Sequence, residues 1–141
     1  MMRDVEKTIG NLIEKQKLAY IASVDGDGFP NMKAMLSPSK RNGLREFWFS
    51  TNTSSIRVAQ YRENPNASIY FCDSRFYRGV QLRGTMEVLE DAAIKEELWE
   101  TGDEMYYEKG VTDPDYCVLK FTTKDGRYYS NFKSETFEIA T

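Results

Sequence analysis

The stretch STNTSSIRV (residues 50–58) follows an aromatic apolar run and leads into a segment that stops at Asn64-Pro65. Its hydroxyl and amide side chains are typical of a helix start, and the Asn-Pro pair is typical of a helix end. A short helix over residues 55–63 is therefore expected directly after a strand. Arg57 is unusual in that helix, because a cation near the first turn meets the positive end of the helix dipole.

Alternating apolar residues and turn signals predict strands on both sides of this helix. Asp25-Gly26-Asp27-Gly28 reads as a hairpin turn, because glycine permits positive φ, and Gly84 predicts a kink or bulge in its strand. The expected strands are residues 18–24, 29–36, 44–50, 67–72, 80–89, 116–122 and 127–132. Turns are expected at residues 38–43 and at residues 124–126, the latter pairing the last two strands. Helices are expected at residues 4–17, 55–63 and 91–99.

Seven or so strands with inserted rather than alternating helices favour a mainly β, α+β chain, either an antiparallel barrel or a sandwich. A doubly wound parallel sheet is not expected. The 141 residues are enough for one domain with a proper core, and 40% apolar with 29% charged residues is an ordinary globular balance. We therefore expect a single domain over residues 1–141.

Residue usage excludes several kinds of chemistry. Histidine is absent, so serine triads, histidine acid/base catalysis and the commonest zinc and haem ligations lose their usual residue. Cys72 and Cys117 stand alone in apolar strands and are expected to be buried small side chains rather than a disulfide or metal site. No apolar run approaches the roughly 20 residues that cross a bilayer, and the first residues do not read as a signal peptide. A cytoplasmic location is expected.

Charge is unevenly distributed along the chain. Residues 33–57 carry net +4, although the whole chain is net −3, so the remainder is −7. A phosphate at the helix start would suit this positively charged stretch, because it could accept hydrogen bonds from Ser54, Ser55 and Arg57. The alternative is an ordinary helix cap with an exposed arginine. The phosphate loop and the dinucleotide fingerprint are both missing, and a pI near 5.1 disfavours nucleic acid as the partner.

The order of several motifs resembles a known family, the pyridoxamine 5'-phosphate oxidase-like flavoproteins, and in particular its short general-stress-protein branch. The resemblance covers residues 5–135 and implies an antiparallel six- to seven-stranded split β-barrel with flanking helices. It also implies a homodimer that holds flavin mononucleotide (FMN) between its subunits. The blocks that carry it are GFPNMKAM (28–35), FWFSTNTSSIRV (47–58), RENPNASIYF (62–71) and VQLRGTMEVL (80–89).

The same resemblance implies a set of cofactor-binding residues. Lys33 stands where the family places a cation toward the FMN phosphate or the polar edge of the ring, although it could be an ordinary solvent-facing lysine. The adjoining strand positions match the backbone that lines the ring, and the Ser-x-Arg pattern matches the phosphate site. With Ser54 from the helix-start argument, the set is Lys33, Met35, Leu36, Ser50, Thr51, Ser54, Ser55 and Arg57.

Departures from the family pattern affect the expected reaction. Pyridoxal-forming oxidases usually have a second basic residue at the position of Ile56, a Gln near Gly79, and a C-terminal segment with Arg and His. Because these are missing, we expect a small FMN oxidoreductase that uses reduced nicotinamide or a similar donor, not a pyridoxamine 5'-phosphate oxidase. A non-enzymatic flavin-binding stress or redox protein is the alternative. A deazaflavin could replace FMN, and no catalytic residue is assigned.

Overall fold

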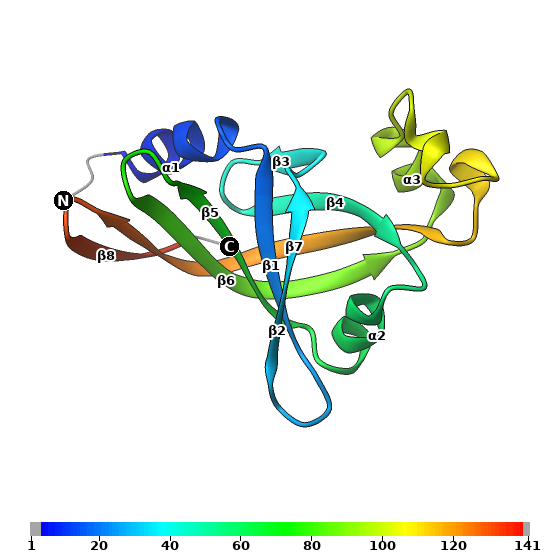
Figure 1. Cartoon of the computed structure of the whole chain (residues 1–141), viewed down its shortest axis with the longest axis horizontal. Coiled ribbons are helices and arrows are strands. Elements are labelled where there is room, and N and C mark those ends of the chain that lie inside the picture. Colours follow the sequence, from blue (N-terminus) through cyan, green and yellow to red (C-terminus); the bar gives the residue numbers. More distant parts are fainter. Residues whose placement is uncertain (1–3, 140–141) are drawn as a thin grey trace.

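The computed structural model describes residues 4–139 and contains eight strands and three α-helices (Figure 1). The expectation about Met1 to Arg3 lies outside the described residues. The helices are α1 (Val5–Glu14), α2 (Ile56–Glu63) and α3 (Ala92–Leu98), with short 3-10 turns at Asp103–Met105 and Gly110–Thr112. The strands are β1 (Leu18–Val24), β2 (Pro30–Leu36), β3 (Lys40–Asn42), β4 (Glu46–Asn52), β5 (Asn66–Asp73), β6 (Arg78–Leu89), β7 (Tyr116–Ser130) and β8 (Lys133–Glu138).

All neighbouring strands are antiparallel, in the order β2-β1-β5-β6-β7-β4-β3. β8 pairs with residues 125–130 of β7, beyond the part of β7 that pairs with β4. The long strands β6 and β7 curve along most of the molecule, and α1 and α3 lie near its opposite ends (Figure 1). This arrangement confirms the expected mainly antiparallel split-barrel class. Within residues 4–139, none of the helices combines the length and apolar character needed to cross a bilayer.

The core forms where the inner sides of the strands and α1 meet. Strand alternation turns every second residue inward, as the buried–intermediate pattern along β5 shows. Asp4 caps α1 by accepting a hydrogen bond from the Lys7 backbone, and one face of the helix is buried. Fully buried residues of this core include Ile9, Ile21, Leu44, Phe47, Phe49, Ile69, Phe71, Leu82, Leu119 and Phe121.

The predicted hairpin at residues 124–126 is wrong, because β7 runs unbroken through it. Gly126 lies inside the strand, where an added Cβ would lie 2.5 Å from Phe137 Cζ and 2.8 Å from Leu82 Cδ2. Glycine is therefore needed there for close packing, not for a turn. The real turn is at Asn131 and Phe132, with φ of 52° and 63°, and it leads into the unexpected strand β8.

Two other turn predictions have different outcomes. The Asp25–Gly28 hairpin is confirmed, with Gly28 at φ 84° and its N–H donating to the Asp25 carbonyl at 3.0 Å. The turn expected at residues 38–43 is only partly correct, because Lys40–Asn42 form β3 and pair with β4. The short edge strand had no alternating pattern long enough to reveal it. Since the strands expected at residues 116–122 and 127–132 are the single strand β7, the two additional strands β3 and β8 bring the total to eight.

The irregularity expected at Gly84 is present. The register between β6 and β7 shifts between Arg83 and Gly84. A Cβ on Gly84 would lie 1.9 Å from the carbonyl oxygen of Thr122 on the neighbouring strand. The bulge therefore brings two backbones into direct contact, which only glycine allows.

Gly84→Ala is expected to lower the free energy of unfolding by more than about 3 kcal/mol, the upper end of ordinary overpacking costs, because the clash is with backbone. Urea denaturation followed by circular dichroism measures this. Gly26→Ala is the matched control, since a Cβ there meets nothing within 4 Å. Equal stability of the two variants would contradict the role of the bulge.

Candidate functional site

A cavity of about 830 Å³ lies between β2, β4, the start of α2 and the segment that follows α3. It contains six of the eight residues predicted from the sequence. These are Lys33, Met35, Leu36, Ser50, Thr51 and Arg57. Ser54 and Ser55 lie in the adjoining loop and do not line the cavity.

The curvature of the sheet brings these residues together. β2 is at one end of the strand order and β4 is next to the other end, yet both line the same cavity. Residues 37–39 connect β2 to β3 and are held on both sides. Ser37 N donates to Lys17 O at 3.0 Å, and Ser39 N donates to Trp48 O at 2.8 Å. The cavity therefore spans the opening between the two ends of the curled sheet.

Arg57 is a half-buried cation without a counter-ion. Its Nε is buried and has no hydrogen-bond partner of acceptable geometry within residues 4–139, and it makes no ion pair there. The buried hydroxyl of Ser50, on the same cavity wall, also lacks such a partner in the described residues. Because buried polar groups are normally satisfied, the Arg57 Nε is available to an acceptor that enters the cavity.

Basic and acidic side chains line different parts of the cavity. Lys17 and Lys33 line it with Arg57, and none of the three has an ion-pair partner in the described part of the chain. Glu100 and Asp103 line the other side, on the segment after α3. An anionic group is therefore favoured at the basic wall.

The loop before α2 already holds a carboxylate of the protein itself. Asp115 Oδ1 accepts a 2.7 Å hydrogen bond from Ser54 N, and its Oδ2 accepts one of 3.0 Å from Asn52 Nδ2. Hydrogen bonds from the Ser54 and Asn52 side chains and the Ser54 backbone hold the pKa of Asp115 below its ordinary value. Ser55 caps α2, its Oγ accepting from Val58 N at 3.4 Å. Sequence reasoning missed Asp115.

Aromatic residues close the cavity on the side of α3. Tyr107 is buried and packs on Tyr116 with ring centroids 4.7 Å apart, while Trp99 meets Tyr116 at 5.3 Å. Burial raises the pKa of the Tyr107 hydroxyl. Tyr106 is exposed at the rim, and both Tyr106 and Tyr107 line the cavity. The sequence left open whether these residues pack the core or border a ligand. In the structure Tyr107 packs against Tyr116 and lines the cavity, whereas Tyr106 is exposed at the cavity rim.

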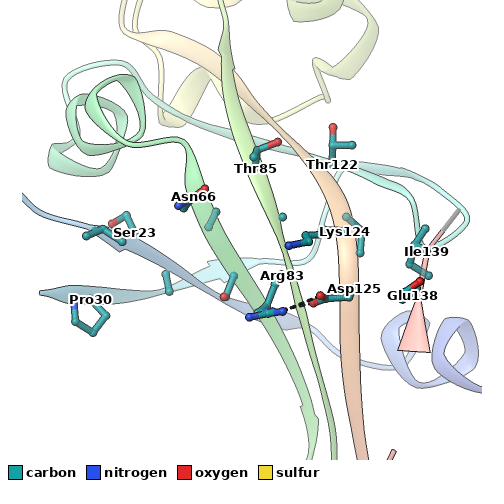
Figure 2. Close-up of a pocket in the computed structure, with 16 residues that line it drawn as sticks. Ser23, Pro30, Asn66, Arg83, Thr85, Thr122, Lys124, Asp125, Glu138 and Ile139 are labelled. Carbon is teal, nitrogen blue, oxygen red and sulfur yellow. Dashed lines mark hydrogen bonds and ion pairs between the residues drawn. The ribbon is translucent and has the colours of Figure 1, made fainter. Parts of the chain in front are cut away.

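A second cavity, of about 690 Å³, lies around the Gly84 bulge (Figure 2). Arg83 faces Asp125 there in a paired contact, with hydrogen bonds of 2.8 and 2.7 Å. None of the eight predicted residues lines this cavity. Because its arginine is already neutralised by a carboxylate, it offers less attraction for an anion than the first cavity, which we take as the candidate site.

Comparison with known proteins places the chain in a family. The family model for pyridoxamine 5'-phosphate oxidase matches residues 5–130. The chain belongs to this family. A curated pyridoxine/pyridoxamine 5'-phosphate oxidase of Caulobacter vibrioides is 33% identical over 72 residues, which are 51% of this chain but only 32% of that enzyme.

Solved structures resemble the chain over nearly its whole length. A Clostridium acetobutylicum protein related to general stress protein 26 of B. subtilis, in the pyridoxinephosphate oxidase family, is 40% identical. It has a TM-score of 0.89, with 99% of this chain and 97% of that chain covered. General stress protein 26 of Bacillus anthracis is 17% identical with a TM-score of 0.78, covering 96% and 98%, and shows the fold alone.

Within residues 4–139, no group of three or more acidic or cysteine side chains is placed to hold a metal ion. Cys117 is buried and Cys72 is half-buried, and both are free thiols. The predicted burial is confirmed for Cys117, whereas Cys72 is less buried than expected.

Two hydrogen bonds anchor α2, and with it Arg57, to β1. Tyr61 donates its hydroxyl proton to the Ala22 carbonyl at 2.9 Å, and Ser23 Oγ donates to Gln60 Oε1 at 2.5 Å. Burial raises the pKa of Tyr61, so its hydroxyl stays protonated and remains a donor. The helix that carries the unpaired cation is therefore fixed to the barrel.

Tyr61→Phe is expected to lower the free energy of unfolding by about 1 kcal/mol, because one buried hydrogen bond is lost without a change in shape. Urea denaturation measures the difference. The control is Tyr77→Phe, since Tyr77 is exposed and its hydroxyl has no hydrogen bond in the described structure. An equal effect of both substitutions would show that the Tyr61 hydroxyl does not anchor the helix.

Proposed function

We propose that this protein binds FMN in the cavity between β2, β4 and α2. The observation that carries the proposal is the buried, unpartnered Nε of Arg57 in a cavity of about 830 Å³. The FMN phosphate is a dianion that would accept charge-assisted hydrogen bonds from this guanidinium. Membership of the pyridoxamine 5'-phosphate oxidase family supports a flavin over other phosphorylated ligands.

The other cavity residues supply complementary groups. The Ser50 and Thr51 hydroxyls would hydrogen-bond the cofactor, while the backbone at Met35 and Leu36 would line its ring. Lys33 is exposed and unpaired in the described structure, so its ammonium is free to stabilise negative charge on the ring. Bound FMN would supply hydride or electron transfer between a donor such as reduced nicotinamide and a small acceptor. A deazaflavin remains the competing ligand in a binding test.

We propose a small oxidoreductase rather than a pyridoxamine 5'-phosphate oxidase. Ile56 is 70% exposed where those oxidases usually carry a second basic residue, so no cation extends the phosphate site at this position. The curated oxidase matches the chain over only about a third of its own length, and its substrate is not transferred from that match. Steady-state oxidation of reduced nicotinamide with several acceptors separates an enzyme from a flavin-binding stress or redox protein, which would show no turnover.

We propose that a homodimer forms over the outer face of β1 and β2. This face exposes apolar side chains next to the cavity, with Met32 73% and Leu36 67% exposed, and Leu36 opposite the partly exposed Leu18. A second copy would bury them and could cover the cavity mouth. The free thiols at Cys72 and Cys117 fit a reducing, cytoplasmic location, which cell fractionation checks.

Arg57→Ala is expected to weaken FMN binding roughly tenfold to a hundredfold, about 1.5 to 3 kcal/mol, because a charge-assisted phosphate contact is lost. Titration followed by quenching of flavin fluorescence measures it. Arg62→Ala is the matched control on the same helix, since Arg62 is exposed and paired with Glu90 at 2.9 Å. Unaltered FMN affinity in Arg57→Ala would reject the phosphate role of Arg57.

Met32→Glu is expected to convert the dimer to a monomer at micromolar concentration, because it places charge in the proposed interface. Sedimentation velocity or light scattering gives the mass. Met105→Glu introduces the same charge at another exposed methionine, 79% exposed and outside this face, and should leave the dimer intact. A wild-type protein that is already monomeric would refute the proposed interface.

A further inference from the structure

Asp115 contacts three consecutive residues of the loop between β4 and α2. Its carboxylate accepts from Asn52 Nδ2 at 3.0 Å and from Ser54 N at 2.7 Å, and its backbone carbonyl accepts from Thr53 N at 2.8 Å. The residue itself does not line the cavity. It therefore holds the loop from the side, outside the proposed ligand site.

This loop decides where Arg57 lies. Ser55 N donates to Asn52 O at 3.0 Å, which closes the turn, and Ser55 then caps the helix whose first turn contains Arg57. Thr51, immediately before the loop, is part of the cavity wall. A shift of the loop would therefore move the cation relative to the hydroxyl groups on β4.

Asp115 is itself held by the segment that forms the opposite wall. Asp113 Oδ1 accepts from Asp115 N at 2.9 Å, and the Asp113 carbonyl accepts from the buried ammonium of Lys95 at 3.0 Å. Tyr116, the next residue, donates its hydroxyl proton to Lys95 O at 2.9 Å. The same segment supplies the cavity residues Glu100 and Tyr107. Asp115 thus joins the two walls of the cavity.

We propose that Asp115 is a positioning residue for the phosphate end of the ligand site, acting by fixing residues 52–54 so that Arg57 stays at the cavity. This inference rests on the proposed FMN binding. The proposal predicts whether removing the Asp115 carboxylate weakens or tightens FMN binding. If the negative charge of Asp115 acted only by repelling a phosphate, its removal would tighten binding; if Asp115 positions the loop, its removal weakens binding.

The test compares FMN with riboflavin, which has the same ring and no phosphate. In Asp115→Ala, FMN affinity should fall about tenfold, as expected for losing charged hydrogen bonds, while riboflavin affinity changes less than about twofold. Asp115→Asn should restore most of the affinity, because its amide oxygen can still accept from Ser54 N. Tighter FMN binding in either variant, or an equal loss for both ligands, would overturn the proposal.

A double-mutant cycle tests whether Asp115 acts through Arg57. The double variant Asp115→Ala/Arg57→Ala should bind FMN no more weakly than Arg57→Ala alone, because the cation that is positioned is already gone. If the two losses in affinity multiply, the residues act independently and the inference fails. If the wild-type protein binds no FMN, the proposed function fails together with this inference. If the wild type binds FMN and the Asp115 variants bind it equally well, the proposed function stands and only this inference fails.

Amide hydrogen exchange supplies a readout that needs no ligand. Residues 53–58 should exchange faster in Asp115→Ala than in the wild type, with the Ser54 amide changed most. Asp4→Ala is the matched control, because Asp4 also caps a helix by accepting from a backbone N–H, that of Lys7 at 3.0 Å, and its helix α1 takes no part in the hydrogen bonds that hold Asp115 in the described structure. Unchanged exchange at residues 53–58 in Asp115→Ala would overturn the inference.

Discussion

The close contact between β6 and β7 at Gly84 is the constraint on which the rest of the structure depends. Without a Cβ, β6 can bring its backbone against Thr122 and shift its register there. A bulge increases local twist and bends the sheet. The bending allows β2 and β4, from opposite parts of the strand order, to line one cavity. A sheet without this curvature would keep Lys33 and Arg57 apart.

Once the barrel is curled, the cation without a counter-ion in the described residues marks the surface best suited to bind an anion. Elsewhere the arginines have a carboxylate partner, as in the ion pairs of Arg83 with Asp125 and of Arg78 with buried Asp73. Arg57 has no such partner within the described residues, and its Nε is withdrawn from solvent. Leaving a cation in this state costs free energy unless an anion completes the site. The proposed cofactor phosphate would complete it, while Asp115 keeps the loop in place.

Family membership limits the function less than the site does. Members of one family can share a barrel and differ in substrate, because the chemistry depends on side chains around the ligand. This chain shares its full length with a general-stress-protein relative at 40% identity, but only part of its length with a curated oxidase. Ile56, which is exposed beside the proposed phosphate site, separates the chain from the pyridoxal-forming pattern. The binding half of the site is therefore better supported than any particular reaction.

The sequence by itself determined most of the strands, the helix after residue 55 and the irregularity at Gly84, because alternation, capping residues and glycines act on their immediate neighbours. It also selected six residues that share one cavity, through an ordered set of motifs. Only the tertiary structure revealed that Gly126 serves packing rather than a turn, since the side chains that require it, Leu82 and Phe137, come from other strands. Likewise, Asp115 meets Ser54 across 61 residues of chain, and no local pattern encodes a contact made only when the barrel closes.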